Sequence, residues 1–131
     1  MRAVDTNVLI RILVDDPKQK EQVRVAHQFA KKAGNVFVPQ IVQVELVWVL
    51  ETAYSLDKQE IVRILTHLEE NEAFSLQYES QFFAALHYYQ SFNADFSDCL
   101  ILAECNEMKY TLFTFDKKFS KLPDVKYLPE T

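Results

Sequence analysis

The sequence predicts an α/β fold built on a parallel β-sheet, and three observations lead to this prediction. Short runs rich in β-branched and aromatic residues alternate with longer segments of helical periodicity, a pattern typical of parallel sheets whose strands are joined by helices. The 131 residues contain a single glycine, Gly34, so long flexible loops are not expected. The sequence has no repeats, linkers or low-complexity segments, which favours one domain spanning residues 1–131.

The first part of the chain begins with a short strand at 3–4 and a helical turn or two at 8–14. Asp16, with a proline directly after it, has the pattern of a helix start, and Gly34 is the residue type that commonly ends a helix. A helix is therefore predicted between them. A second strand follows at 36–38, where valines flank a phenylalanine.

The segment 41–54 predicts an unusual helix, because it is apolar nearly all round. Such a helix has to be covered on most of its sides. In a domain this small a second protein chain is the natural cover, so a homodimer is predicted. The alternative is a monomer whose own core covers the helix. One acid, Glu45, lies inside this apolar run.

The second part of the chain continues the alternation of helices and strands. Asp57 and Glu60 have the spacing of a capping box, which predicts the start of another helix. The remaining elements are, in order, a strand at 74–76, a helix for which Ser80 is a candidate cap, a helix that starts at 95–98, a strand at 112–114 and an edge strand at 126–128.

Composition excludes several classes of protein. No run approaches the roughly 18 apolar residues of a membrane span, and the N-terminus lacks a signal-peptide pattern, so a cytoplasmic protein without membrane contact is expected. Cys99 and Cys105 point in different directions from one predicted helix, which disfavours a disulfide. The net charge of −5 argues against a protein that coats nucleic acid by charge alone. It does not argue against a nuclease, whose acidic site holds a metal ion that meets the phosphate.

Four acids stand out by their positions along the chain. Asp5 directly follows the first predicted strand, and Asp116 directly follows the fourth. Because sites in open parallel sheets gather at the carboxyl ends of the strands, these two acids are expected at one edge. Glu45 and Asp98 lie in helices near their starts and can reach the same edge.

Clustered carboxylates suit a particular chemistry. Mg²⁺ and Mn²⁺ are hard cations that prefer carboxylate and water oxygens. One or two such ions can activate water and neutralise charge on a phosphodiester, which is what hydrolysis requires. Without metal the carboxylates repel one another, so metal is expected to stabilise the fold. The four acids therefore predict a metal-dependent phosphodiester hydrolase.

Each acid also has a simpler interpretation when taken alone. Asp5 is a candidate cap for the following turn, and Glu45 a candidate for an exposed stripe of its helix. Asp98 has the position of the last residue in a capping box that Asp95 begins. Asp116, with two lysines after it, has the pattern of a turn residue. The joint arrangement is what favours a site.

Four segments of the chain, taken together and in order, carry a resemblance to a known family. They are 4–10, 39–46, 94–101 and 114–119, which hold Asp5, Glu45, Asp98 and Asp116. They resemble the four motifs of the PIN-domain family and, within it, of the VapC toxins of bacterial and archaeal toxin–antitoxin pairs. The first motif alone is weak, whereas all four at the usual spacings are specific.

The resemblance implies a three-layer α/β/α domain with a central parallel sheet of about five strands. It implies an endoribonuclease that depends on Mg²⁺ or Mn²⁺, in which the four acids form the metal site. It also implies a homodimer and an antitoxin whose tail occupies the active-site groove. By the same resemblance Thr6, Asn7 and Thr114 are supporting polar groups that orient a carboxylate or metal-bound water. Asp95 is a spare acid one helical turn from Asp98, for which a cap role is favoured over a contribution through water.

The contacts with RNA and the identity of the RNA are less well specified. Arg11, Lys117, Lys118 and Lys121 are the plausible phosphate contacts, although the three lysines suit a solvated surface equally well. The alternative function is a catalytically silent PIN-fold module that binds RNA or protein. A phosphatase with an aspartate nucleophile is disfavoured, because Asn7 stands where the second aspartate of that motif would be.

Overall fold

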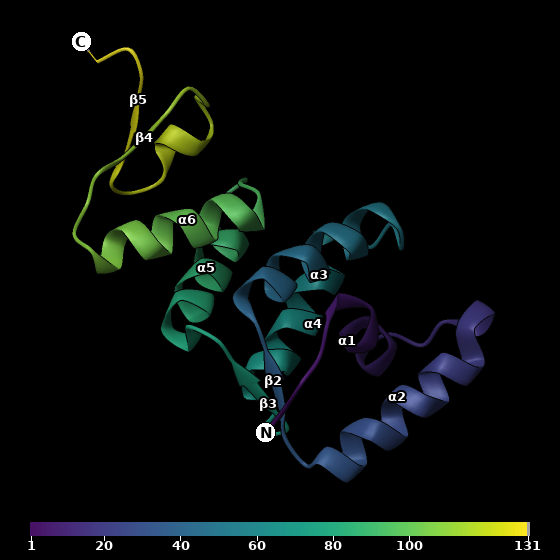
Figure 1. Cartoon of the computed structure of the whole chain (residues 1–131). Coiled ribbons are helices and arrows are strands. Elements are labelled where there is room, and N and C mark those ends of the chain that lie inside the picture. The colour runs from purple at the N-terminus through teal and green to yellow at the C-terminus, as the bar shows by residue number, and fades with distance from the viewer. Residues whose placement is uncertain (131) are drawn as a thin grey trace. The chain divides into compact units, whose positions relative to one another are not determined.

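The computed structural model describes residues 1–130, and its α/β class confirms the prediction. These residues form six α-helices and five short strands, and every strand pair among them is parallel. The chain divides into two compact units, Met1–Gln77 and Tyr78–Thr131. Figure 1 labels the elements of each unit along the chain.

The first unit contains a three-stranded sheet and four helices. The strands have the order β1-β2-β3, and Arg2 is in register with Val36, which is in register with Phe74. Helix α1 packs against α2 and α3, and α3 packs against α4. The elements are β1 (Arg2–Ala3), α1 (Thr6–Leu13), a 3₁₀ turn (Pro17–Gln19), α2 (Lys20–Ala33), β2 (Val36–Val38), α3 (Gln40–Thr52), α4 (Lys58–Glu70) and β3 (Phe74–Leu76).

Local signals explain most of these boundaries. Gly34 adopts a φ of 75°, the left-handed conformation that favours glycine, and ends α2. Asp57 and Glu60 form the predicted capping box at the start of α4. The predicted helix start at Asp16 is displaced, because the Asp16 side chain caps the 3₁₀ turn and α2 begins afterwards at Lys20.

Helix α3 is less completely covered than its composition suggested. Its buried side chains include Val42, Leu46 and Leu50. Ile41 and Trp48 are 70% and 64% exposed, although both are large and apolar. They lie on the same stripe of the helix as Glu45, because the three residues follow a spacing of three to four.

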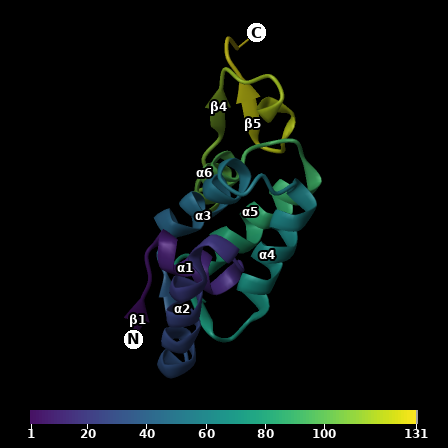
Figure 2. The same ribbon diagram turned by 90° about the vertical axis from the view of Figure 1, so that its right-hand side faces the viewer.

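The second unit contains a helix pair and a two-stranded parallel sheet. Helix α5 (Glu79–Ser91) packs against α6 (Phe96–Glu107), and the Phe96 ring meets the Phe82 ring edge-on at 5.8 Å. Strands β4 (Leu112–Thr114) and β5 (Val125–Tyr127) lie side by side (Figure 2), with a 3₁₀ turn at Phe119–Lys121 between them in sequence. A core of four apolar side chains forms here: Leu102, Phe119, Leu122 and Val125.

Two further predictions meet different outcomes in the second unit. The cap assigned to Ser80 is wrong: α5 begins at Glu79, and the Ser80 hydroxyl donates to Glu107 on α6 at 2.6 Å. Cys99 is buried and Cys105 half-buried, and no disulfide joins them within the part of the chain described, as predicted.

Across residues 1–130, no helix combines the length and the apolar character that crossing a bilayer would take.

The capping box at α4 should contribute measurably to stability. Replacing Asp57 by alanine removes the acceptor for the Glu60 N–H, so we expect Asp57→Ala to lower the free energy of unfolding by about 1 kcal/mol in urea denaturation. Asp57→Ser keeps an acceptor at the same position and should lose less than half as much. Equal losses in the two variants would contradict a capping role.

Candidate functional site

Asp5 lies where the chain passes from β1 into α1. It is the N-cap of α1, and its Oδ1 accepts a hydrogen bond from the Val8 N–H at 3.0 Å. The simpler interpretation of this residue as a cap is therefore present in the structure. The cap bond uses one oxygen of an exposed carboxylate, so a cap role and a metal role can coexist.

Glu45 lies on the exposed stripe of α3, as its simpler interpretation foresaw. The Thr6 hydroxyl donates to Glu45 Oε1 at 2.9 Å, which joins the first residue of α1 to the middle of α3. Because Thr6 follows Asp5 directly, this bond connects the local surroundings of the two acids. Asn7, next along α1, is exposed and lies beside Asp5 at the edge of a pocket.

In the second unit, Asp98 lies in the first turn of α6 and is half-buried. Partial burial raises the pKa of this carboxyl above its ordinary value, and the negative charges of Asp95 and Asp116 raise it further. Asp95 occupies the N-cap position, yet among residues 1–130 its side chain makes no cap hydrogen bond. The capping box that offered a simpler interpretation of Asp98 is thus not formed.

Asp116 lies in the turn that follows β4. Its Oδ1 accepts hydrogen bonds from the Lys118 N–H at 2.9 Å and the Phe119 N–H at 3.2 Å. The Thr114 hydroxyl oxygen in turn accepts from the Asp116 N–H at 3.0 Å. Asp116 is therefore a turn residue, and the turn fixes its carboxylate within the electrostatic range of Asp98.

Arg11 has partners that the sequence did not reveal. Its Nε donates to Gln22 at 2.9 Å, and its Nη1 donates to the Tyr54 hydroxyl at 2.8 Å and lies 3.8 Å from Asp16. Hydrogen bonds from the Lys18 N–H and then from Tyr54 hold the pKa of Asp16 below its ordinary value. The guanidinium thus joins α1 to α2 and to the chain beyond α3, a role that no local sequence pattern signals.

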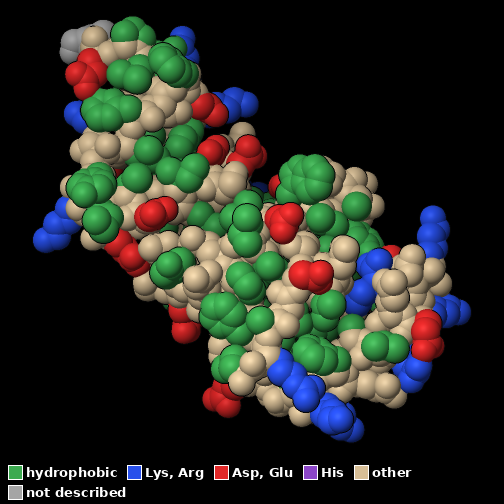
Figure 3. All heavy atoms as spheres, in the orientation of Figure 1, with side chains coloured by type: hydrophobic (Ala, Val, Ile, Leu, Met, Phe, Trp, Pro, Cys, Tyr) green, Lys and Arg blue, Asp and Glu red, His purple; other side chains and the backbone are tan. Residues whose placement is uncertain are grey.

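The three predicted lysine contacts lie in the second unit, and a further group of basic side chains lies in the first. Lys117, Lys118 and Lys121 are exposed in the turn after β4, and Lys117 Nζ lies 5.7 Å from the centre of the Tyr127 ring. On the face drawn in Figure 3, blue Lys and Arg side chains gather over α2 and the segment before it. The basic residues of that part of the chain are Lys18, Lys20, Arg24, Lys31 and Lys32.

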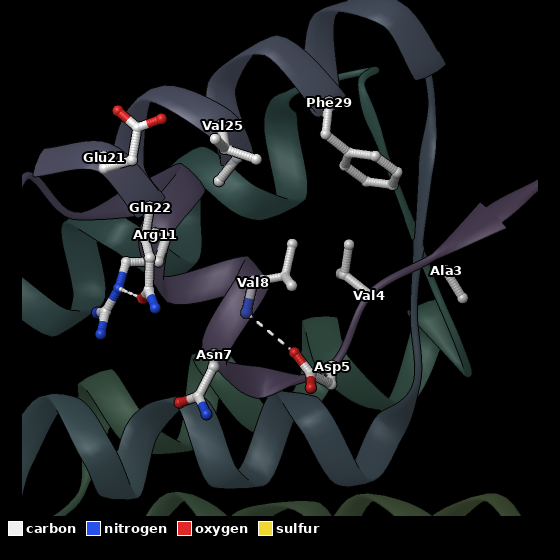
Figure 4. A pocket seen from close by; sticks show the side chains of 11 residues that line it. Ala3, Val4, Asp5, Asn7, Val8, Arg11, Glu21, Gln22, Val25 and Phe29 are labelled. Carbon is white, nitrogen blue, oxygen red and sulfur yellow. Dashed lines mark hydrogen bonds between the residues drawn. The ribbon is translucent and has the colours of Figure 1, made fainter. Parts of the chain in front are cut away.

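A pocket of about 530 Å³ lies beside Asp5 in the first unit, between α1, α2 and β1. In Figure 4, Val8 lies between Asp5 and the hydrogen-bonded Arg11 and Gln22, and Phe29 and Val25 of α2 lie on the opposite side of the pocket from Asp5. The apolar lining consists of Ala3, Val4, Val8, Val25, Ala26 and Phe29. A largely apolar pocket with polar groups at its margin is typical of binding sites.

The donor chemistry of the predicted acids fits a hard divalent cation. Within residues 1–130 no three His, Cys, Asp or Glu side chains form a group that could hold one ion. Instead each unit supplies two of the predicted carboxylates, Asp5 and Glu45 in the first and Asp98 and Asp116 in the second. Carboxylate oxygens are ligands that Mg²⁺ prefers, and Mg²⁺ commonly keeps several waters beside one or two carboxylates.

Comparison with known proteins shows which family and which proteins the chain is similar to. The family model described as PIN domain matches residues 2–125. A VapC ribonuclease from Aquifex aeolicus (strain VF5) is 26% identical over 124 residues, which cover 93% of this chain and 92% of that protein. A chain in the solved toxin–antitoxin complex from Klebsiella pneumoniae is 20% identical over 95% of both chains, with a TM-score of 0.35. That structural likeness is too low to bear on the fold.

The raised pKa of Asp98 has a consequence for stability. A carboxyl with a raised folded-state pKa favours the folded protein while it is protonated, and this contribution is lost as the pH rises through the raised pKa. Asp98→Asn is neutral at every pH, so we expect it to raise the Tm of the metal-free protein at pH 7 by about 2 °C. The difference from wild type should disappear as the pH falls below the ordinary range of an aspartate.

Thermal unfolding followed by circular dichroism in EDTA measures this effect. Asp15→Asn is the matched control, because it removes one negative charge from an exposed position in the first unit. A gain of the same size in Asp15→Asn would assign the effect to net charge and not to the surroundings of Asp98.

Proposed function

The chain belongs to the PIN domain family, and on that basis we propose that it is an endoribonuclease that hydrolyses RNA phosphodiester bonds with Mg²⁺ or Mn²⁺. The observation that carries the proposal is that the matching residues, 2–125, contain all four predicted acids. The relative described as a VapC ribonuclease supports RNA as the substrate.

We assign the binding of the cation to Asp5, Glu45, Asp98 and Asp116. When bound, the cation would supply an activated water and positive charge against the phosphate. Burial and then the negative charges of Asp95 and Asp116 raise the pKa of Asp98, and this supports the assignment because a divalent cation would offset those charges.

The chain's own residues have distinct tasks in this proposal. Thr6 holds one oxygen of Glu45 and so restricts how the carboxylate turns. Thr114 holds the backbone of Asp116, whose turn directs the carboxylate. Asn7 and Asp95 are supporting polar groups, since both are exposed next to a proposed ligand.

The contacts with RNA and with proteins extend the same proposal. Lys117, Lys118 and Lys121 would contact phosphates, because they are exposed directly after Asp116. Arg11 is a weaker candidate, since Gln22, Tyr54 and Asp16 already engage its guanidinium.

We further propose that the protein is the toxin of a toxin–antitoxin pair acting in the cytoplasm, with a cognate antitoxin as partner. The relative's description as a VapC ribonuclease supports this role. We also propose that the protein forms a homodimer. Exposed Ile41 and Trp48 on α3 support it, because large apolar side chains on one stripe favour a protein contact.

Incubation of the purified protein with total cellular RNA tests the proposal. We expect discrete fragments with Mg²⁺ or Mn²⁺ and none with EDTA. Asp5→Asn and Asp98→Asn should each lower the cleavage rate by about 100-fold or more, because each removes a proposed cation ligand. Asp15→Asn, an exposed aspartate outside the proposed site, should cleave like wild type.

A folded wild-type protein that binds Mn²⁺ and leaves RNA intact would contradict the enzyme and favour the alternative of a silent module that binds RNA or protein. Cleavage that survives EDTA and both substitutions would instead point to a contaminating nuclease.

A further inference from the structure

A buried glutamine lies at the start of α3, two residues before Glu45. The Gln43 side chain is fully buried, in a helix whose other buried residues are apolar. Its Nε2 donates to the backbone oxygens of Val38 at 3.2 Å and Gln77 at 2.9 Å. Val38 is the last residue of β2, and Gln77 follows the last residue of β3. One side chain of α3 thus binds the carboxyl ends of two strands.

Gln77, which follows β3, in turn forms a hydrogen bond with the first residue of α3. Its Oε1 accepts a hydrogen bond at 2.8 Å from the N–H of Gln40, the first residue of α3. The N-cap residue of α3 is Pro39, whose ring offers no acceptor, so Gln77 performs the capping task from a distant part of the chain. The Gln77 N–H also donates to the Val38 oxygen at 3.0 Å. Gln43 and Gln77, the glutamine pair, therefore fasten the first turn of α3 to the strand ends.

The glutamine pair and the Glu45 carboxylate lie on opposite sides of the helix. Two residues correspond to a rotation of about 200° on an α-helix, which agrees with the burial of Gln43 and the exposure of Glu45. On the exposed side, Glu45 Oε1 accepts from the Thr6 hydroxyl. A rotation of α3 about its axis would move Glu45 away from Thr6, and the glutamine pair opposes this rotation.

The glutamine at position 43 has one favourable and one unfavourable effect on stability, because its Nε2 pairs two carbonyl oxygens while its Oε1 stays unpaired. Among the side chains of residues 1–130, Gln43 Oε1 is the one buried polar atom without a hydrogen-bond partner. An apolar side chain of similar size would avoid burying that oxygen but would leave the two carbonyl oxygens without this donor. Apolar contact has no preferred direction, however, whereas hydrogen bonds to two carbonyl oxygens fix an orientation. The advantage of Gln43 is therefore the orientation of α3.

We infer that Gln43 and Gln77 are positioning residues, which set the rotation of α3 and thereby the place of the Glu45 carboxylate. The inference rests on the proposed function in one respect, since Glu45 matters to the reaction as a cation ligand. The hydrogen bonds that carry it all lie within the first unit.

Four variants separate positioning from a general loss of stability. Gln43→Met keeps the length of the side chain and removes both donated bonds. Gln77→Met removes the acceptor for the Gln40 N–H, whereas Gln77→Glu keeps it. Leu50→Ala is the control, because it destabilises a buried apolar position of α3 about two helical turns from Gln43.

The first readout is the affinity for Mn²⁺, measured from the paramagnetic resonance signal of the free ion, with Glu45→Gln as the reference for a lost ligand. We expect Gln43→Met and Gln77→Met to weaken Mn²⁺ binding about tenfold, as the loss of groups that orient a ligand does. Gln77→Glu and Leu50→Ala should stay within about twofold of wild type. The second readout is hydrogen exchange at the Gln40 amide, which should quicken in Gln77→Met and not in Gln77→Glu.

The outcomes distinguish this inference from the proposed function. If Glu45→Gln weakens Mn²⁺ binding but neither methionine variant does, the positioning role is overturned and the proposed ligand stands. If Glu45→Gln binds Mn²⁺ like wild type, the proposed role of Glu45 fails, and hydrogen exchange then decides on the glutamine pair alone. Unchanged exchange at Gln40 in Gln77→Met would overturn the pair as the attachment of α3.

Discussion

The strands of this protein are two or three residues long, and the backbone N–H groups that begin the next helix or turn need hydrogen-bond partners. Side chains near the strand ends meet this requirement. Asp5 accepts from the first turn of α1, Asp116 from the turn after β4, and Gln77 from the first residue of α3. Two acids of the proposed site, Asp5 and Asp116, are thus also residues that let a strand end and the next element begin.

The closeness of several carboxylates in the second unit has an electrostatic consequence. Partial burial raises the pKa of Asp98 above its ordinary value, and the negative charges of Asp95 and Asp116 raise it further. A bound divalent cation would reduce the repulsion between these carboxylates, and a phosphate group could serve as a further ligand of the cation. The acidity of the chain, with a net charge of −5, and a proposed role in RNA hydrolysis are therefore compatible.

The sequence by itself determined the features that depend on neighbours a few residues apart. The alternation of apolar runs predicted the α/β class and placed the strands at 36–38, 74–76 and 112–114 at the observed residues. The capping box at Asp57 and the helix end at Gly34 also followed from local chemistry. The match of residues 2–125 to the PIN domain model agrees with the resemblance carried by the four motifs. Whether the four acids form one metal site stays a prediction.

Tertiary structure alone decided the features that join distant parts of the chain. The bond from Thr6 to Glu45 spans 39 positions, and that from Gln40 to Gln77 spans 37. Ser80 has the composition of a cap, yet its hydroxyl bonds Glu107 because the packing of α5 on α6 brings the two together. A side chain's type fixes which bonds it can form, whereas its partner depends on which elements pack beside it. Local patterns therefore located the acids, and the packing of α3 on the strand ends oriented Glu45.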